Sequence, residues 1–75
     1  MARIVQLAYE PKDFRIQEDV KATYSINVFG NEKLFQINTY GKPTREFSNV
    51  PSQVIQFNKR TAQEIIKVLK SEFNI

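Results

Sequence analysis

The stretch that decides the fold runs from residue 23 to residue 40 and reads Thr23-Tyr24-Ser25-Ile26-Asn27-Val28-Phe29-Gly30-Asn31-Glu32-Lys33-Leu34-Phe35-Gln36-Ile37-Asn38-Thr39-Tyr40. Apolar and polar side chains alternate in its first half, and the second half repeats the alternation. A period of two is typical of strands with one buried face. Gly30 and Asn31 tolerate positive φ, so the stretch predicts a hairpin with a loop of two or four residues.

The outward face of this hairpin combines two aromatic rings with amides and hydroxyls. Its residues are Thr23, Ser25, Asn27, Phe29, Leu34, Gln36, Asn38 and Tyr40. Unpaired bases stack on aromatic rings and amides reach base edges, so the face is a candidate nucleic-acid platform. The alternative is structural: Phe29 and Leu34 form a cross-strand pair that the N-terminal segment or a second protomer covers.

A loop and one more strand follow the hairpin. Residues 41–51 are expected to form a loop that Phe47 and Val50 anchor against the core. Residues 53–57 resume the alternation, with Ile55 and Phe57 inward and with Val54 and Gln56 outward, which predicts a last short strand.

The C-terminal residues predict one amphipathic helix. It begins either with Asn58 as the N-cap or with Thr61 as the N-cap and Glu64 in capping-box spacing. An apolar stripe at helical spacing is expected to pack on the sheet. Its members are Ala62, Ile65, Ile66, Leu69 and Phe73. Val68 lies beside the stripe and either contacts a second protomer, with Ile65 and Glu72, or is partly exposed.

The N-terminal residues predict two short strands, at residues 3–8 and 14–18, and residues 1–12 form either an extra strand or a flexible arm. The fold class is therefore α+β: one domain over residues 1–75, with a curved four-stranded antiparallel sheet (a β-meander) followed by one C-terminal helix. A chain of 75 residues buries only about 60–65% of its unfolded surface. We therefore expect a homodimer that forms through the helix.

The composition excludes several classes of function. The chain has no cysteine and no histidine, which removes disulfides, thiol nucleophiles and imidazole metal sites. The acidic residues Asp13, Glu18, Asp19 and Glu32 form no acid–base or metal constellation, and no glycine-rich phosphate loop is present. We expect neither an enzyme nor a cofactor or metal. No apolar stretch approaches twenty residues, so a soluble, cytoplasmic protein without a membrane partner is expected.

The charge favours a polyanionic partner. The net charge is +3, and residues 21–75 hold eight basic and four acidic side chains. Six of the basic residues fall at ends of strands or in loops, where they are expected to rim the outward face: Lys21, Lys33, Lys42, Arg45, Lys59 and Arg60. Each of them alone is better explained as a solvated surface charge, and it is their clustering after residue 20 that favours a polyanionic partner.

Three pieces of sequence resemble the positive cofactor four family of transcriptional coactivators and its small bacterial and phage relatives. They are the turn at residues 28–33 (VFGNEK), the strand at 35–40 (FQINTY) and the junction at 55–58 (IQFN), and the resemblance covers residues 13–73. Members of that family are dimers whose curved sheets hold single-stranded DNA through aromatic and basic residues. The resemblance implies stacking by Phe29 and a phosphate contact by Lys33, and it places Tyr40 near the second stacking aromatic of the family. Residues 45–51 (REFSNVP) depart from the Lys/Gly-rich loop of the family, so no phosphate contact is carried over to them.

The resulting hypothesis is a dimeric, non-enzymatic binder of single-stranded DNA that acts in transcription, replication or repair. Its site comprises Lys21, Ser25, Asn27, Phe29, Lys33, Gln36, Asn38, Tyr40, Lys42, Arg45, Lys59 and Arg60. RNA is an equally good ligand for these residues. The main alternative is a small protein-interaction module of a phage or mobile element, which uses the same face or an exposed strand edge.

Overall fold

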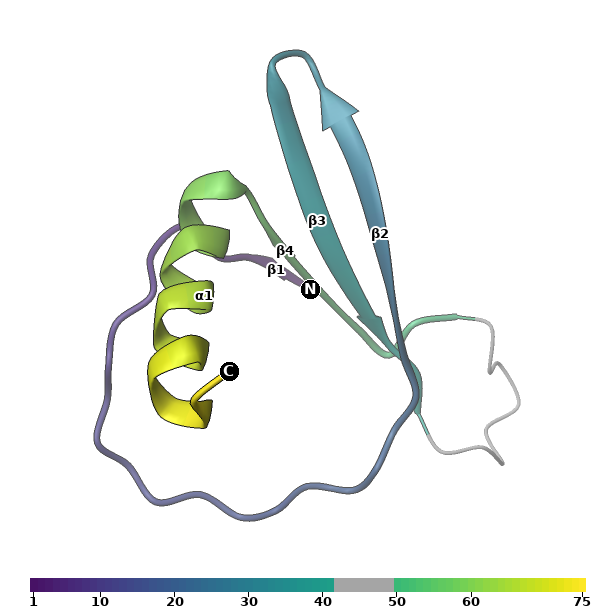
Figure 1. Ribbon diagram of the computed structural model, residues 1–75. Coiled ribbons are helices and arrows are strands. Elements are labelled where there is room, and N and C mark those ends of the chain that lie inside the picture. Colours follow the sequence, from purple (N-terminus) through teal and green to yellow (C-terminus); the bar gives the residue numbers. More distant parts are fainter. Residues whose placement is uncertain (42–49) are drawn as a thin grey trace.

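The computed structural model describes residues 1–41 and 50–75, which form a four-stranded sheet and one C-terminal helix (Figure 1). The α+β class is therefore confirmed. The elements are β1 (Ala2–Arg3), β2 (Ala22–Phe29), β3 (Glu32–Thr39), β4 (Gln53–Phe57) and α1 (Lys59–Phe73). The predicted site residues Lys42 and Arg45 and the predicted anchor Phe47 lie outside the described residues.

The central hairpin is formed as predicted. Strands β2 and β3 pair in antiparallel register from Ala22 opposite Thr39 to Phe29 opposite Glu32, which leaves a loop of two residues. Gly30 has φ 63, whereas Asn31 does not have a positive φ. This combination is that of a type II′ turn, which needs positive φ only at its first central residue and therefore favours glycine there.

The sheet is mixed, and the prediction of a purely antiparallel meander is wrong. Its strand order is β1-β4-β3-β2, with β1 parallel to β4. The strand predicted at residues 3–8 is reduced to two residues, and residues 14–18 form no strand. Ile4 explains the early end of β1. Its N–H still donates to the Gln56 carbonyl (2.8 Å), but its own carbonyl accepts from Thr61 Oγ1 on the helix (3.1 Å), after which the chain leaves the sheet.

The helix begins at the first of the two predicted signals. Asn58 is extended (φ −101, ψ −173) and its side-chain oxygen accepts a hydrogen bond from the Thr61 N–H at 3.3 Å, so Asn58 is the N-cap. At the other end, Asn74 has left-handed geometry (φ 55, ψ 45), which ends the helix after Phe73. Among the described helices, α1 included, none is long and apolar enough to cross a membrane.

The register divides the side chains of the sheet into two faces. The apolar face carries Tyr24, Ile26, Val28, Phe35, Ile37, Ile55 and Phe57. The polar face carries Thr23, Ser25, Asn27, Phe29, Glu32, Leu34, Gln36, Asn38, Tyr40, Val54 and Gln56. Across the apolar face, Tyr24 stacks on Phe35 at 5.4 Å between ring centroids, and Phe35 stacks on Phe57 at 5.2 Å. The predicted inward and outward residues of each strand therefore do share faces.

The helix covers little of the apolar face. It starts beside the end of β4 and diverges from the rest of the sheet (Figure 1). Ala62 and Ile65 are half-buried, but the three other members of the predicted stripe, Ile66, Leu69 and Phe73, are exposed. The expectation that this stripe packs on the sheet is thus wrong for most of its length. Val50, the other predicted anchor, is also exposed.

Candidate nucleic-acid interface

A row of amide side chains crosses the polar face from β4 to β3. Gln56 Nε2 donates to Gln36 Oε1 at 2.7 Å, and Gln36 Nε2 donates to Asn38 Oδ1 at 2.6 Å. Gln36 and Gln56 are direct partners in the ladder, which brings their side chains together. The face therefore presents an ordered set of amides instead of independent surface side chains.

Hydroxyl groups continue the row onto β2. Asn38 Nδ2 lies 3.2 Å from Thr23 Oγ1 and 3.4 Å from Ser25 Oγ. Asn38 is only 6% exposed, and these bonds satisfy an amide that would otherwise be costly to bury. The Thr23 hydroxyl also lies 3.5 Å from the Tyr40 hydroxyl, so the network reaches one of the two predicted stacking rings.

The two aromatic rings of the polar face lie at opposite ends of the hairpin. Phe29 ends β2 beside the turn and is 61% exposed. Tyr40 follows β3 and is half-buried, and its N–H donates to the Lys21 carbonyl at 3.0 Å. Eight residue steps along the hairpin separate the two positions, or about 26 Å at ~3.3 Å per residue. The face thus offers two stacking positions with polar groups between them.

A cluster of charged and polar groups lies opposite Phe29. Glu32, the register partner of Phe29, accepts from Arg3 Nη2 at 2.7 Å and from Asn58 Nδ2 at 3.0 Å. The hydrogen bond from Asn58 is the largest effect and lowers the pKa of Glu32; desolvation opposes it, and the charge and hydrogen bond of Arg3 lower the pKa further. The cluster joins the turn of the hairpin to β1 and to the start of the helix.

Replacing Glu32 by glutamine is expected to flatten the pH dependence of stability in acid. Because the folded-state pKa of Glu32 lies below its unfolded value of about 4.3, the carboxylate stabilises the fold fully above that value. This contribution is lost as the pH falls through the lowered folded-state pKa. Thermal midpoints measured from about pH 7 to pH 2.5 test this, with Glu64→Gln on the exposed helix surface as control. Parallel profiles for wild type and Glu32→Gln would contradict the assignment.

The predicted basic residues are divided between several places. Lys33 lies on the apolar face, where it and Lys59 line a groove of about 370 Å³ with Ile26, Phe35 and Phe57. The structure therefore places Lys33 away from the polar face that it was expected to rim, because Lys33 belongs to β3 and lies two residues from Phe35, on the same face. Lys21 adjoins Tyr40, and Lys59 and Arg60 are exposed in the first turn of α1.

Sequence reasoning missed Arg3, and it left Gln56 out of the site although it placed Gln56 on the outward face. Arg3 is brought to Glu32 by the parallel pairing of β1 with β4. No local sequence pattern predicts this pairing. Gln56 joins the amide row, and its outward position in the alternation was a usable signal. By contrast, Ser25, Asn27, Gln36 and Asn38 share one face as expected.

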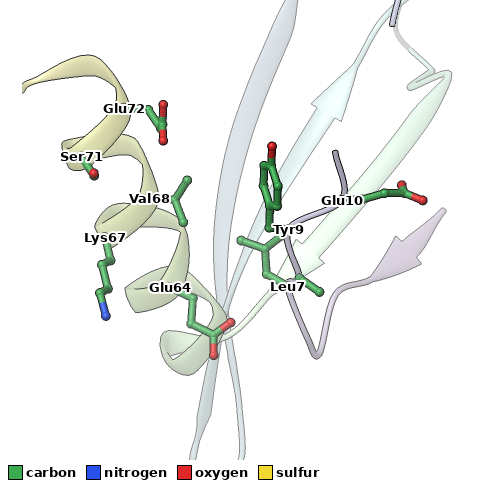
Figure 2. Close-up of a pocket in the computed structure, with 9 residues that line it drawn as sticks. Leu7, Tyr9, Glu10, Glu64, Lys67, Val68, Ser71 and Glu72 are labelled. Atoms are coloured by element: carbon green, nitrogen blue, oxygen red, sulfur yellow. The ribbon is translucent and has the colours of Figure 1, made fainter. Parts of the chain in front are cut away.

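A second groove lies between the N-terminal segment and the helix. Figure 2 shows Val68 directed toward Leu7 and Tyr9, and the groove has a volume of about 750 Å³. Three of its lining residues, Glu10, Glu64 and Glu72, are acidic and one, Lys67, is basic. The acidic excess opposes phosphate groups, so this groove is a poor nucleic-acid site. It also shows that Val68 faces residues of its own chain.

Comparison with known proteins identifies no relative, so the site is assigned from the residues of this chain alone. No protein-family model, no curated protein and no solved structure matches the chain. Within residues 1–41 and 50–75, no group of three or more acidic side chains is arranged to hold a metal ion.

Proposed function

We propose that this protein binds single-stranded nucleic acid, with DNA as the first ligand to test, through the polar face of its sheet. The observation that carries the proposal is the exposure of Phe29 on the face that carries the row of hydrogen-bonded amides and hydroxyls. A large apolar ring in such surroundings offers a stacking surface to an unpaired base. Tyr40 offers a second stacking position at the far end of the same face.

The charge of the chain supports the same ligand. Residues 21–75 carry twice as many basic as acidic side chains, eight against four. At the turn, Arg3 offsets the carboxylate of Glu32 beside Phe29, and Lys21 adds a positive charge next to Tyr40. We propose non-enzymatic binding by a homodimer inside the cell, in transcription, replication or repair. The mode is tolerant of sequence, because every base has a face that can stack.

Fluorescence anisotropy with labelled DNA tests the proposal. Single-stranded and duplex oligonucleotides of equal length are compared at about 50 mM and about 200 mM salt. We expect tighter binding to the single strand and a loss of affinity at higher salt, because phosphate contacts release counterions. A labelled RNA of the same sequence then separates the two single-stranded ligands.

Two results would overturn the proposal. One is the absence of binding at low salt, and the other is equal affinity for single strand and duplex. Either would direct attention to the protein-interaction alternative. The observation that favours this alternative is that β2 lies at the edge of the sheet, with no strand beyond it among the described residues.

A further inference from the structure

A single chain exposes far more surface than is expected of a folded protein of its mass. A folded monomer of 8.8 kDa is expected to expose about 4,800 Å², whereas this chain exposes 7157 Å². Its radius of gyration is 14.5 Å, against about 11 Å for a compact domain of this length. Among the described residues, only Leu34, Asn38, Phe57 and Thr61 are buried. A single copy therefore lacks the core that a stable small domain needs.

Besides residues 1–21, which are exposed except for Ile4, two apolar areas of the sheet and the helix are exposed, and they are of kinds that pack together. One is the part of the apolar face on β2, where Tyr24, Ile26 and Val28 are all exposed. The other is the stripe of α1, with Ile66, Leu69 and Phe73 exposed. An amphipathic helix and the apolar face of a sheet are the standard partners of a two-layer domain. In this chain both are present, and they do not cover each other.

We propose that the occupant of the apolar face is the helix of a second copy of this chain, so that two copies exchange their α1 helices reciprocally. Exchange of identical elements gives a closed two-fold dimer, in which every contact occurs twice. If half of the excess area of each chain is buried, the interface totals about 2,400 Å², within the range of obligate homodimers. The inference deepens the homodimer of the proposed function and does not depend on nucleic-acid binding.

This arrangement differs from a dimer in which Val68 mediates contact between the helices. Val68 already faces Leu7 and Tyr9 of its own chain, whereas Leu69 and Phe73 do not line that groove. In the exchanged dimer the polar face stays outward on both copies, since only the apolar face is covered. The groove lined by Lys33, Phe35, Phe57 and Lys59 then closes over the partner's helix.

Light scattering after size-exclusion chromatography gives the first test. We expect the wild type to have twice the 8.8 kDa mass of the chain. Leu69→Lys, which places a charge in the proposed interface, is expected to convert the protein to a monomer or an unfolded chain. Gln63→Lys, on the exposed part of the same helix, is the matched control and is expected to leave the dimer intact. A monomeric wild type at micromolar concentration overturns the inference.

Cross-linking decides which surfaces meet, and the absence of natural cysteine makes it specific. Ile26→Cys chains with one affinity tag are refolded with Leu69→Cys chains that carry another, and a short bis-maleimide is added. We expect a doubly tagged product. The matched pair Asn27→Cys and Gln63→Cys, with one residue on the polar face, is expected to give none. Cross-linking only within a chain that carries both Ile26→Cys and Leu69→Cys would show that each helix covers its own sheet and would overturn the exchange.

The outcomes separate this inference from the proposed function. A dimer that cross-links only through Val68→Cys would overturn helix exchange. It would not overturn the proposed function, because a homodimer joined in another way can still bind nucleic acid. A cross-linked exchanged dimer with no affinity for single-stranded DNA would support the exchange and overturn the proposed function.

Discussion

Replacement of Phe29 by alanine is expected to weaken binding to single-stranded DNA by about 5- to 150-fold, since one base stacked on an aromatic ring contributes about 1–3 kcal/mol. The ring is 61% exposed and no ring of the described residues stacks on it, so its removal leaves no cavity. The folded structure should therefore persist. Anisotropy titrations at one fixed salt concentration measure the effect, and circular dichroism checks the fold.

Phe14 provides the matched control for this substitution. It is 89% exposed and lies in the segment between β1 and β2, outside the strands of the sheet. Phe14→Ala removes a ring of the same size and is expected to leave the affinity within about twofold, as surface substitutions usually change free energies by less than ~0.5 kcal/mol. Equal losses in the two variants, or no loss in Phe29→Ala, would contradict a stacking role for Phe29.

Replacement of Phe57 by alanine is expected to have the largest effect on stability. Phe57 is 8% exposed, stacks on Phe35 at 5.2 Å and precedes the N-cap of the helix. Truncation of a buried phenylalanine costs about 3–5 kcal/mol. The core of a domain this small supplies about as much in total, so the variant should be largely unfolded at 25 °C.

Urea denaturation followed by circular dichroism tests this expectation, at equal protein concentration because dimer stability depends on it. Phe29→Ala is the control for loss of a ring and should unfold near the wild-type midpoint. Phe29→Ala is thus expected to lower the affinity for DNA without lowering stability, whereas Phe57→Ala is expected to lower stability. A cooperative transition of Phe57→Ala within about 1 kcal/mol of wild type would show that the core lies elsewhere.

The local elements were predictable because their signals are local. Alternation over residues 23–40 and the Gly30-Asn31 pair predict the hairpin and the residues that share each face, whereas the choice between a loop of two and of four residues was left open. The predicted strand at residues 53–57 has the observed bounds of β4, and Asn58 was one of two stated alternatives for the N-cap. In each case the residues that decide the geometry are close together in the chain.

The predictions that were wrong concern residues whose structure depends on partners distant in the sequence. The parallel pairing of Ala2 with Ile55 joins residues more than fifty positions apart, and the 14–18 segment has strand alternation but no strand beside it. Alternation also identifies which residues share a face without showing which face is covered. Here the amides of Gln36 and Asn38 are more buried than Tyr24 and Ile26 on the apolar face.

The candidate site was predictable to a similar extent. The grouping of Ser25, Asn27, Gln36 and Asn38 followed from the period of the strands, and the structure brings them together. Lys33 depended on the length of the turn, since a two-residue loop makes Lys33 part of β3, where the alternation places it on the same face as Phe35. Arg3 reaches the site only through the tertiary structure, so no sequence pattern could assign it.

The amide row on the polar face also has a direction. Each donor points the same way, from Gln56 to Gln36, from Gln36 to Asn38, and from Asn38 to the hydroxyls of β2. If one amide turned alone, two donors would meet on one side of it and two acceptors on the other, so the row reorients as a unit or keeps its orientation. Because each amide is held by its neighbours, these side chains do not reorient one at a time to match individual bases. Under the proposed function, a nucleic-acid strand that crosses the face would meet the same groups whatever its base order, which would favour movement along the strand over arrest at one sequence.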